Sequence, residues 1–270
     1  MELLLKLACL PRSSYYYRTK ALKTPAKHEL ERDAIRSICL EHRGRYGYRR
    51  VTLALHGKGY PSNHKLVMKL MREEGLTCQL RKKRYRSYKG LVGKIAPNLL
   101  NRNFKATKPN QKWATDVTEF KVLGKRYYLS PILDLFNGEV VSYSLTSRPS
   151  FASIVEMLKK AFQRLPEKLA LILHSDQGWQ YQMKQYQRLL AEKGIQQSMS
   201  RKGNCYDNAV VENFFGMLKS EFFENRTFYS ESEFQEGLMA YLDYYNNARI
   251  KVKLNGLSPI SYRTQSNVLT

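Results

Sequence analysis

The hydrophobic pattern changes its period near the middle of the chain. Residues 28–90 carry apolar side chains at helical spacing, and glycine-containing turns divide them into three segments. From Trp113 to Val122 apolar and polar residues alternate, as in a strand that buries one face. Residues 169–174 are almost uniformly apolar, which is typical of a strand covered on both faces. The pattern therefore predicts a helical region followed by a sheet.

After residue 112 the pattern predicts one mixed sheet with helices on its faces. Asn137-Gly138 is a strong hairpin signal between the second and third strands. The predicted strands are 113–122, 126–133, 140–145, 169–174 and 195–198, and the predicted helices are 151–164, 184–193, one that carries Glu212, and 230–247. This order indicates the α/β fold class, with a mixed five-stranded sheet and flanking helices.

The three helical segments in residues 28–90 fit a small all-α helix-turn-helix domain. Ser62 or Asn63 is the expected cap of the third helix, and Gly75 is its stop signal. A recognition helix presents polar side chains to a DNA groove, with arginines nearby on the phosphates. The candidate DNA contacts are Asn63, His64, Lys65 and Lys69 on the third helix, and Arg49 and Arg50 on the second. A plain helical hairpin gives the same pattern, so the charge has to separate the two interpretations.

The charge of the chain is large and unevenly distributed. Lys and Arg total 46 against 23 Asp and Glu, which gives a net charge of +23. Residues 1–105 hold 25 basic and 7 acidic side chains, so +18 of that charge lies in them. A region this basic favours a polyanionic partner such as nucleic acid over a merely solvated surface.

The composition excludes several classes of protein. Hydrophobic residues make up 43% of the chain, too many for a disordered protein. No apolar run approaches the roughly 20 residues that cross a bilayer, and the N-terminus does not fit a secretory signal. We therefore expect a cytoplasmic protein without a membrane partner. The four cysteines form no CxxC pair, which argues against a disulfide framework and a structural zinc site.

The predicted domain organisation has five parts. They are a basic N-terminal segment (1–27), a helix-turn-helix DNA-binding domain (28–90), a basic linker (91–108), a core that holds the sheet (109–225) and a C-terminal helical extension of the core (226–270). The N-terminal segment combines tyrosines with arginines, which suits a DNA contact and suits packing on the next domain equally well.

Three acids fall where the strands and helices of such a sheet converge. Asp116 lies in the first strand, Asp176 follows the apolar strand, and 35 residues separate Asp176 from the helical Glu212. Converging carboxylates repel one another unless a cation joins them, and hard ions such as Mg²⁺ prefer carboxylate oxygens. A pair of such ions can activate the attacking oxygen and stabilise the leaving oxygen of a phosphodiester. Our hypothesis is a metal site for DNA phosphodiester chemistry.

Other residues support this hypothesis or compete with it. Lys219, seven residues after Glu212, and Asn208, four before it, share its helix face, and both are candidate DNA contacts, with Lys219 suited to a phosphate. His174 alternates onto the face of Asp176 and either orients that acid or is a structural histidine. Each acid also has an ordinary interpretation as a turn or surface residue. The acids that compete for the same roles are Asp134, Asp207 and Glu221.

Several motifs together resemble a known family. They are Tyr46-Gly47-Tyr48-Arg49-Arg50, Trp113-Ala114-Thr115-Asp116-Val117-Thr118, His174-Ser175-Asp176-Gln177-Gly178 with Gln180-Tyr181, Ser198-Met199-Ser200-Arg201-Lys202-Gly203-Asn204, Asp207-Asn208-Ala209-Val210-Val211-Glu212 with Phe214-Phe215 and Leu218-Lys219, Tyr244-Tyr245-Asn246, Arg249, and Leu257-Ser258-Pro259. These motifs span roughly residues 30–265. They resemble the B-frame (OrfB) transposases of bacterial insertion sequences, whose catalytic domain is similar to retroviral integrase cores.

The resemblance implies an RNase H-like integrase core over residues 109–225 with an Asp-Asp-Glu site. Asp116, Asp176 and Glu212 fill the catalytic and metal-binding positions, and Lys219 fills the position of a basic residue that contacts DNA. The implied cofactor is Mg²⁺ or Mn²⁺, with two ions in the active complex. The implied function is a transposase that cleaves and strand-transfers the DNA ends of an insertion sequence.

The resemblance also implies partners and two departures. The partners are the element's terminal repeats, target DNA and the product of an upstream frame (OrfA), often joined by frameshifting; we also expect a homo-oligomer on DNA. Trp179 stands where a small polar residue is usual, and the N-terminal region lacks the zinc-binding His/Cys set of retroviral integrases, so no zinc is expected. The rival interpretations are an RNase H-like metal-dependent nuclease that does not join DNA, and a non-catalytic DNA-binding regulator.

Overall fold

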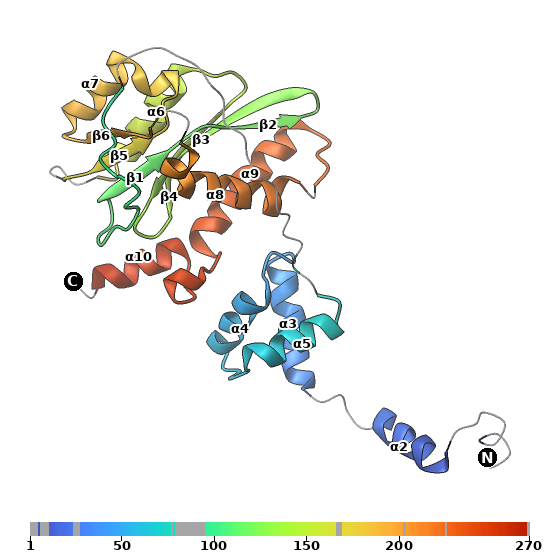
Figure 1. Cartoon of the computed structure of the whole chain (residues 1–270). Helices are drawn as coiled ribbons and strands as arrows, with labels where there is room; N and C mark the ends of the chain where they lie inside the picture. The colour runs from blue at the N-terminus through green and yellow to red at the C-terminus, as the bar shows by residue number, and fades with distance from the viewer. Residues whose placement is uncertain are drawn as a thin grey trace. The chain divides into compact units, whose positions relative to one another are not determined.

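The computed structural model of the chain divides into two compact units, Met1–Cys78 and Gln79–Thr270 (Figure 1). It describes residues 5, 11–23, 28–76, 78, 95–165, 169–201, 204–224 and 226–268. In its described residues the first unit contains helix α2 (Arg12–Lys23), which the hydrophobic pattern did not predict, and three further helices. The second unit contains the sheet.

The three predicted helices of the first unit are confirmed. They are α3 (Glu29–Glu41), α4 (Tyr48–Gly57) and α5 (His64–Glu73). Their shared core consists of Ile35, Ile38, Cys39, Val51, Leu55, Val67, Leu70 and Met71, all nearly inaccessible to water. Arg32 on α3 forms ion pairs with Glu73 and Glu74 at the end of α5. The Oδ1 atom of Asn63 accepts the backbone N–H of Lys65 at 2.9 Å, which confirms Asn63 as the cap of the third helix.

The sheet of the second unit is mixed, as predicted, and has helices on both faces. Its strands are β1 (Lys112–Thr115), β2 (Thr118–Val122), β3 (Lys125–Asp134), β4 (Val140–Thr146), β5 (Ile172–Ser175) and β6 (Gln196–Met199). Strands β1 and β5, and β5 and β6, are parallel, whereas β3 is antiparallel to β1, β2 and β4.

The strand predicted over residues 113–122 is interrupted, which explains why the sheet counts six strands rather than five. Leu129 pairs with Thr118 on one side and Leu145 on the other, so β1 and β2 lie end to end along the same side of β3. The sheet therefore has five positions across. At the break, the Asp116 carboxylate accepts the N–H of Val117 at 2.7 Å, which removes that donor from strand pairing.

Two apolar layers sandwich the sheet (Figure 1). Helices α6 (Phe151–Phe162) and α7 (Lys184–Glu192) supply one layer, packed on the Trp113 and Ile132 side. Helices α8 (Ala209–Leu218) and α9 (Glu231–Asn247) supply the other layer, which is rich in phenylalanine. Each large apolar side chain that is fully buried contributes about 1.5–3 kcal/mol, so both faces hold the strand ends firmly in place.

Part of the predicted basic linker lies along the core. The carbonyl of Pro97 accepts the N–H of Met199 at 3.3 Å, and Leu99 donates its N–H to the Ser198 hydroxyl at 2.9 Å. Residues 79–94 with the run Arg81–Arg86 fall outside the described residues. Within the described ranges, no helix has the length and apolar character needed to cross a bilayer.

The C-terminal region contains more helix than predicted. After the predicted helix 230–247, η4 (Val252–Leu254) and α10 (Pro259–Val268) follow, connected through left-handed backbone at Asn255 and Gly256. Arg263 on α10 donates to the buried carboxylate of Glu139 at 2.8 Å and to Asn110 at 3.0 Å. Helix α10 is thus joined to the sheet by polar contacts that the apolar pattern does not encode.

Candidate active site

Asp116 and Asp176 lie at the same edge of the sheet. Strands β1 and β5 are parallel neighbours, and Ala114 pairs with His174. Because the two strands run in step, Thr115 and Ser175 are level and the acids that follow them leave the sheet side by side. The predicted position of Asp176 directly after its strand is confirmed, whereas Asp116 lies at a strand break rather than in mid-strand.

Helix α8 brings Glu212 to this edge. Glu212 lies in the first turn of α8, which packs against β1. Asn208, directly before the helix, donates from Nδ2 to Oδ2 of Asp116 at 3.1 Å. The amide of Asn208 therefore connects the start of α8 to the first acid, and it is buried there rather than presented to solvent.

The electrostatics of the three acids indicate that they are close neighbours. Burial, the Asp176 carboxylate and the Glu212 carboxylate all raise the pKa of Asp116, and the raised value is well above the ordinary one. Burial also raises the pKa of Asp176 and of Glu212. Each ionised acid makes ionisation of Asp116 less favourable, a cost that a cation bound between them would relieve.

The local hydrogen bonds orient two of the acids. Asp116 accepts the N–H of Val117 on one oxygen and the Asn208 amide on the other. Asp176 accepts the N–H of Gly178 at 2.8 Å. A Cβ atom at Gly178 would lie 2.9 Å from that same carboxylate oxygen, so only glycine allows this close turn. In the described residues, no three His, Cys, Asp or Glu side chains already form a set arranged to hold a metal ion.

Two buried tyrosines lie close to the acids. Tyr181 and Tyr186 are inaccessible to water, and their rings meet edge to face at 5.4 Å between centroids. Burial, followed by the charges of Asp116 and Asp176, raises the pKa of Tyr181 well above its ordinary value. Burial, followed by the charge of Asp176, also raises the pKa of Tyr186, so both phenols stay neutral.

Asp207, a competitor for the catalytic roles, forms a clamp with two arginines. Its carboxylate is buried and accepts from Arg201 Nε at 2.9 Å, Arg102 Nε at 3.0 Å and Asn98 Nδ2 at 3.0 Å. Hydrogen bonds from Arg201, with Arg102 and the local charges, lower the pKa of Asp207. These hydrogen bonds hold the segments that contain Asn98, Arg102 and Arg201 against Asp207, which directly precedes Asn208.

His174 belongs to the same structural network. Its Nδ1 lies 2.8 Å from the Ser198 hydroxyl and its Nε2 lies 2.9 Å from the carbonyl oxygen of Asp207. Burial lowers the pKa of His174, so the ring is neutral. Of the two predicted roles, the structural one fits these contacts, since neither ring nitrogen bonds to Asp176.

Glu221 and Asp134, the other competing acids, are also structural. Glu221 and Arg249 are both buried and pair at 2.6 Å, and Tyr241 donates its hydroxyl to Glu221 at 2.9 Å. Asp134 accepts the backbone N–H groups of Asn110 and Phe136, and Arg263 lies 3.7 Å away. No spacing rule in the sequence links Arg249 to Glu221.

Lys219 follows α8 directly and begins the π-helical turn η3 (Lys219–Phe223). Its Nζ lies 5.7 Å from the centroid of the Phe120 ring, and burial lowers its pKa while Glu119 and Glu224 act in the opposite direction. Single π-helical turns are frequent at functional sites.

Trp179, in the turn after Asp176, has 51% of its surface exposed.

The predicted DNA contacts of the first unit divide into two groups. Arg49, His64, Lys65 and Lys69 are exposed. Asn63 is occupied as a helix cap, and the guanidinium of Arg50 lies 5.6 Å from the Tyr46 ring and donates to the carbonyl of Arg45 at 3.3 Å. Asn63 therefore has the cap role predicted for it, and Arg50 has structural contacts that the helical pattern alone did not reveal.

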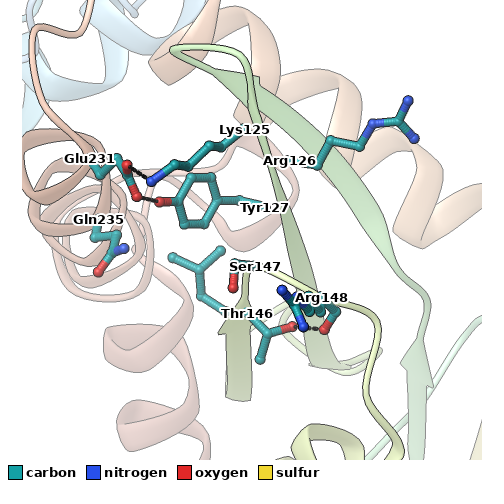
Figure 2. A pocket seen from close by; sticks show the side chains of 9 residues that line it. Lys125, Arg126, Tyr127, Thr146, Ser147, Arg148, Glu231 and Gln235 are labelled. Carbon is teal, nitrogen blue, oxygen red and sulfur yellow. Dashed lines mark hydrogen bonds and ion pairs between the residues drawn. The ribbon is translucent and has the colours of Figure 1, made fainter.

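A separate pocket of about 730 Å³ lies beside β3, β4 and the start of α9 (Figure 2). Lys125 and Tyr127 both contact Glu231 there, and Thr146 donates to the carbonyl of Arg148. Arg126 points away from this group (Figure 2). None of the acids at the sheet edge lines the pocket.

Comparison with known proteins identifies both units. Residues 106–205 and 212–266 match models of the integrase core domain, and residues 26–84 match an HTH-like domain. The chain is 54% identical over 266 residues to the putative transposase InsK for insertion sequence element IS150 of Escherichia coli, covering 98% of this chain and 94% of that protein. It is 36% identical to the transposase for IS904 of Lactococcus lactis, with 88% and 96% covered.

A solved structure with a similar core is the HTLV-2 integrase catalytic core domain in complex with magnesium. The TM-score is 0.48 at 19% identity, and the match covers 58% of this chain and 98% of that one. The match to InsK covers nearly the whole sequence, and the two integrase-core matches contain all three acids. The chain belongs to the insertion-sequence transposases that combine an HTH-like domain with an integrase core, a family of polynucleotidyl transferases.

Proposed function

We propose that Asp116, Asp176 and Glu212 are the catalytic acids with which this transposase cleaves and joins DNA. The observation that carries the proposal is their arrangement: Asp116 and Asp176 leave the sheet side by side, and Glu212 on α8 is near enough for its charge to raise the pKa of Asp116. In the described part of the chain none of the three pairs with a lysine or arginine. Three acids that share a site without an internal cation are suited to a cation from outside.

The donor set fits a hard divalent ion. Carboxylate oxygens are the protein ligands that Mg²⁺ and Mn²⁺ prefer, and the fixed Asp116 and Asp176 carboxylates offer one side of such a site. Glu212, less enclosed and on a helix, offers the third carboxylate. Two bound ions would activate the attacking oxygen and stabilise the leaving oxygen of the phosphodiester. We expect that loading draws Glu212 closer to the two aspartates.

The residues around the acids hold and orient the reacting groups. The N–H groups of Val117 and Gly178 and the Asn208 amide fix the two aspartates in direction. Lys219, two helical turns after Glu212, provides a cation for a DNA phosphate. In the first step water attacks the phosphodiester at the element end and releases a 3′-hydroxyl. That hydroxyl then attacks a target phosphodiester, and the displaced 3′ oxygen of the target strand leaves.

The remaining parts of the proposal concern delivery of DNA. The helix-turn-helix of residues 28–90 would bind the terminal repeats of the element, with Arg49, His64, Lys65 and Lys69 as its exposed contacts. The same proposal includes a homo-oligomer on DNA and the OrfA product as a second protein partner. We propose the same five domains as the sequence predicts, with the limits 1–27, 28–90, 91–108, 109–225 and 226–270.

A strand cleavage and joining assay tests the proposal. The substrate is a labelled duplex that carries the element's own ends, with Mg²⁺ or Mn²⁺ added, and the proteins are wild type and Asp176→Asn. We expect metal-dependent joined products that disappear in the variant while end binding persists. Hydrolysis without joining would support a nuclease. Equal activity in the variant would refute the role of Asp176.

A further inference from the structure

The Asp207 clamp has an exposed side. Tyr206, which directly precedes Asp207 in the chain, has 69% of its surface exposed. The guanidinium carbon of Arg102 lies 5.7 Å from the centre of the Tyr206 ring. Arg102 and Arg201 have half-exposed side chains, at 50% and 53%, whereas the carboxylate that holds them is fully enclosed.

These contacts give the exposed side a fixed geometry and a positive charge. Two hydrogen-bond donors of Arg201 and one of Arg102 are directed to Asp207. An arginine has five N–H donors, so each guanidinium retains donors for another acceptor. Two arginines around one carboxylate leave a net charge of +1. The arginines are held in place before any ligand arrives, which lowers the entropy cost of binding.

The chemistry of this surface matches one nucleotide of a DNA strand. An exposed aromatic ring stacks on a base of any sequence, and guanidinium groups beside it bind the phosphate. The position also fits, because Asn208, which donates to Asp116, is only two residues from Tyr206, at most about 7 Å of backbone. A base that leaves the duplex next to the reacting phosphate would reach this ring.

We propose that Tyr206, Arg102 and Arg201 form a binding platform for one unpaired nucleotide of the DNA end held at the acids. Tyr206 stacks on the base, and the two arginines bind the adjacent phosphate. The buried Asp207 is a positioning residue that holds both arginines. The inference rests on the proposed DNA function, and its purpose is to keep the end of the duplex open at the reacting bond.

Fluorescence of a base analogue tests the platform without catalysis. The probe is a duplex with a single unpaired 2-aminopurine at its end, bound to the full chain in EDTA. Stacking on an aromatic ring quenches this base. We expect quenching by wild type and Tyr206→Phe, and its loss in Tyr206→Ala, with affinity reduced about five- to hundredfold. Affinity for a fully paired duplex should stay within about twofold.

A second exposed tyrosine is the matched control. Tyr229 is 84% exposed and lies before α9, so Tyr229→Ala removes the same ring from a different part of the core. The platform would be overturned if Tyr229→Ala lowers the quenching as much as Tyr206→Ala does. It would also be overturned if Tyr206→Ala leaves the quenching intact. Joining of metal-loaded wild type is measured in parallel, so a failed platform with intact joining is distinguishable from a failed transposase assignment. Unchanged thermal unfolding of Tyr206→Ala excludes misfolding.

Discussion

Asp207 and Asp116 are both carboxylates enclosed by the core, but their partners differ. Asn208 connects them, since it follows Asp207 in the chain and donates to Asp116. Asp207 accepts from two arginines and an asparagine, and this lowers its pKa. Asp116 accepts only from neutral donors and lies beside two other acids, which raise its pKa together with burial. Arginines therefore neutralise the charge of the structural Asp207, whereas no arginine or lysine in the described residues neutralises the charge of Asp116.

The same distinction separates Glu212 from Glu221, nine residues further along the same helical stretch. Glu221 is paired with Arg249 inside the core, whereas Glu212 has no arginine or lysine partner in the described ranges. A buried carboxylate with an internal cation depends on that cation for its neutralisation, and one without such a cation is suited to bind an added ion. Substitutions at each kind of acid should therefore affect different measurements.

Glu212→Gln should give the largest effect, and it should be confined to the chemistry. The change keeps the size of the side chain and removes the charge that an added cation requires. We expect cleavage and joining to fall at least about a thousandfold, which corresponds to about 4 kcal/mol, while the free energy of unfolding changes by less than about 0.5 kcal/mol. Single-turnover rates and urea unfolding measure the two quantities. Substantial residual joining would exclude a direct role.

Arg249→Met should show the opposite profile. It leaves the Glu221 charge buried without its cation, which costs about 3–5 kcal/mol of stability in comparable pairs. Urea or thermal unfolding measures the loss. The double variant Glu221→Gln/Arg249→Met removes both charges and should recover part of it. If Arg249→Met unfolds like wild type, the buried pair does not stabilise the core.

The sequence predicts the acids better than it predicts their supports. Asp176 and Glu212 are predictable because a strand end and a helical period fix where they lie, and the succession of strands and helices along the chain follows from the same periods. The break at Asp116–Val117 is not predictable, since the alternation continues through it and the cause is a local hydrogen bond. The clamp from Arg102 to Asp207 joins residues 105 apart, and no local pattern encodes such a contact.

Asp207→Asn should destabilise the protein in a pH-dependent way. The arginines lower the folded pKa of Asp207, so its contribution is present above the ordinary carboxyl pKa and is lost as pH falls through the folded value. Because water screens the half-exposed arginines, we expect a loss of about 1–2 kcal/mol at neutral pH. The difference from wild type should shrink in acid. Denaturant unfolding from neutral to acidic pH measures it, and a pH-independent difference would contradict the charge-based clamp.

Asp116→Asn should sharpen the contrast by stabilising the protein without metal. The folded pKa of Asp116 is raised, so its favourable contribution is present below the ordinary carboxyl pKa and is lost as pH rises through the folded value. At neutral pH in EDTA the free energy of unfolding of the variant should therefore exceed that of wild type by about 1 kcal/mol. Added Mg²⁺ should stabilise wild type but not the variant. Thermal unfolding with and without Mg²⁺ checks both signs, and an equal metal response would remove Asp116 from the ion site.

Lys65→Ala should give the smallest effect and extends the comparison to cations in the first unit. Lys58 lies 3.4 Å from Glu41, whereas no acid pairs with the exposed Lys65 in the described residues. A cation without an internal acid is suited to a DNA phosphate, and losing one phosphate contact lowers the salt slope of binding by about 1. We expect a several-fold weaker affinity for the terminal repeat, against little change in Lys58→Ala. Binding isotherms across a salt series measure both variants. Equal slopes for the two would place the DNA contact of this unit elsewhere, because the paired and unpaired lysines would then be equivalent to the DNA.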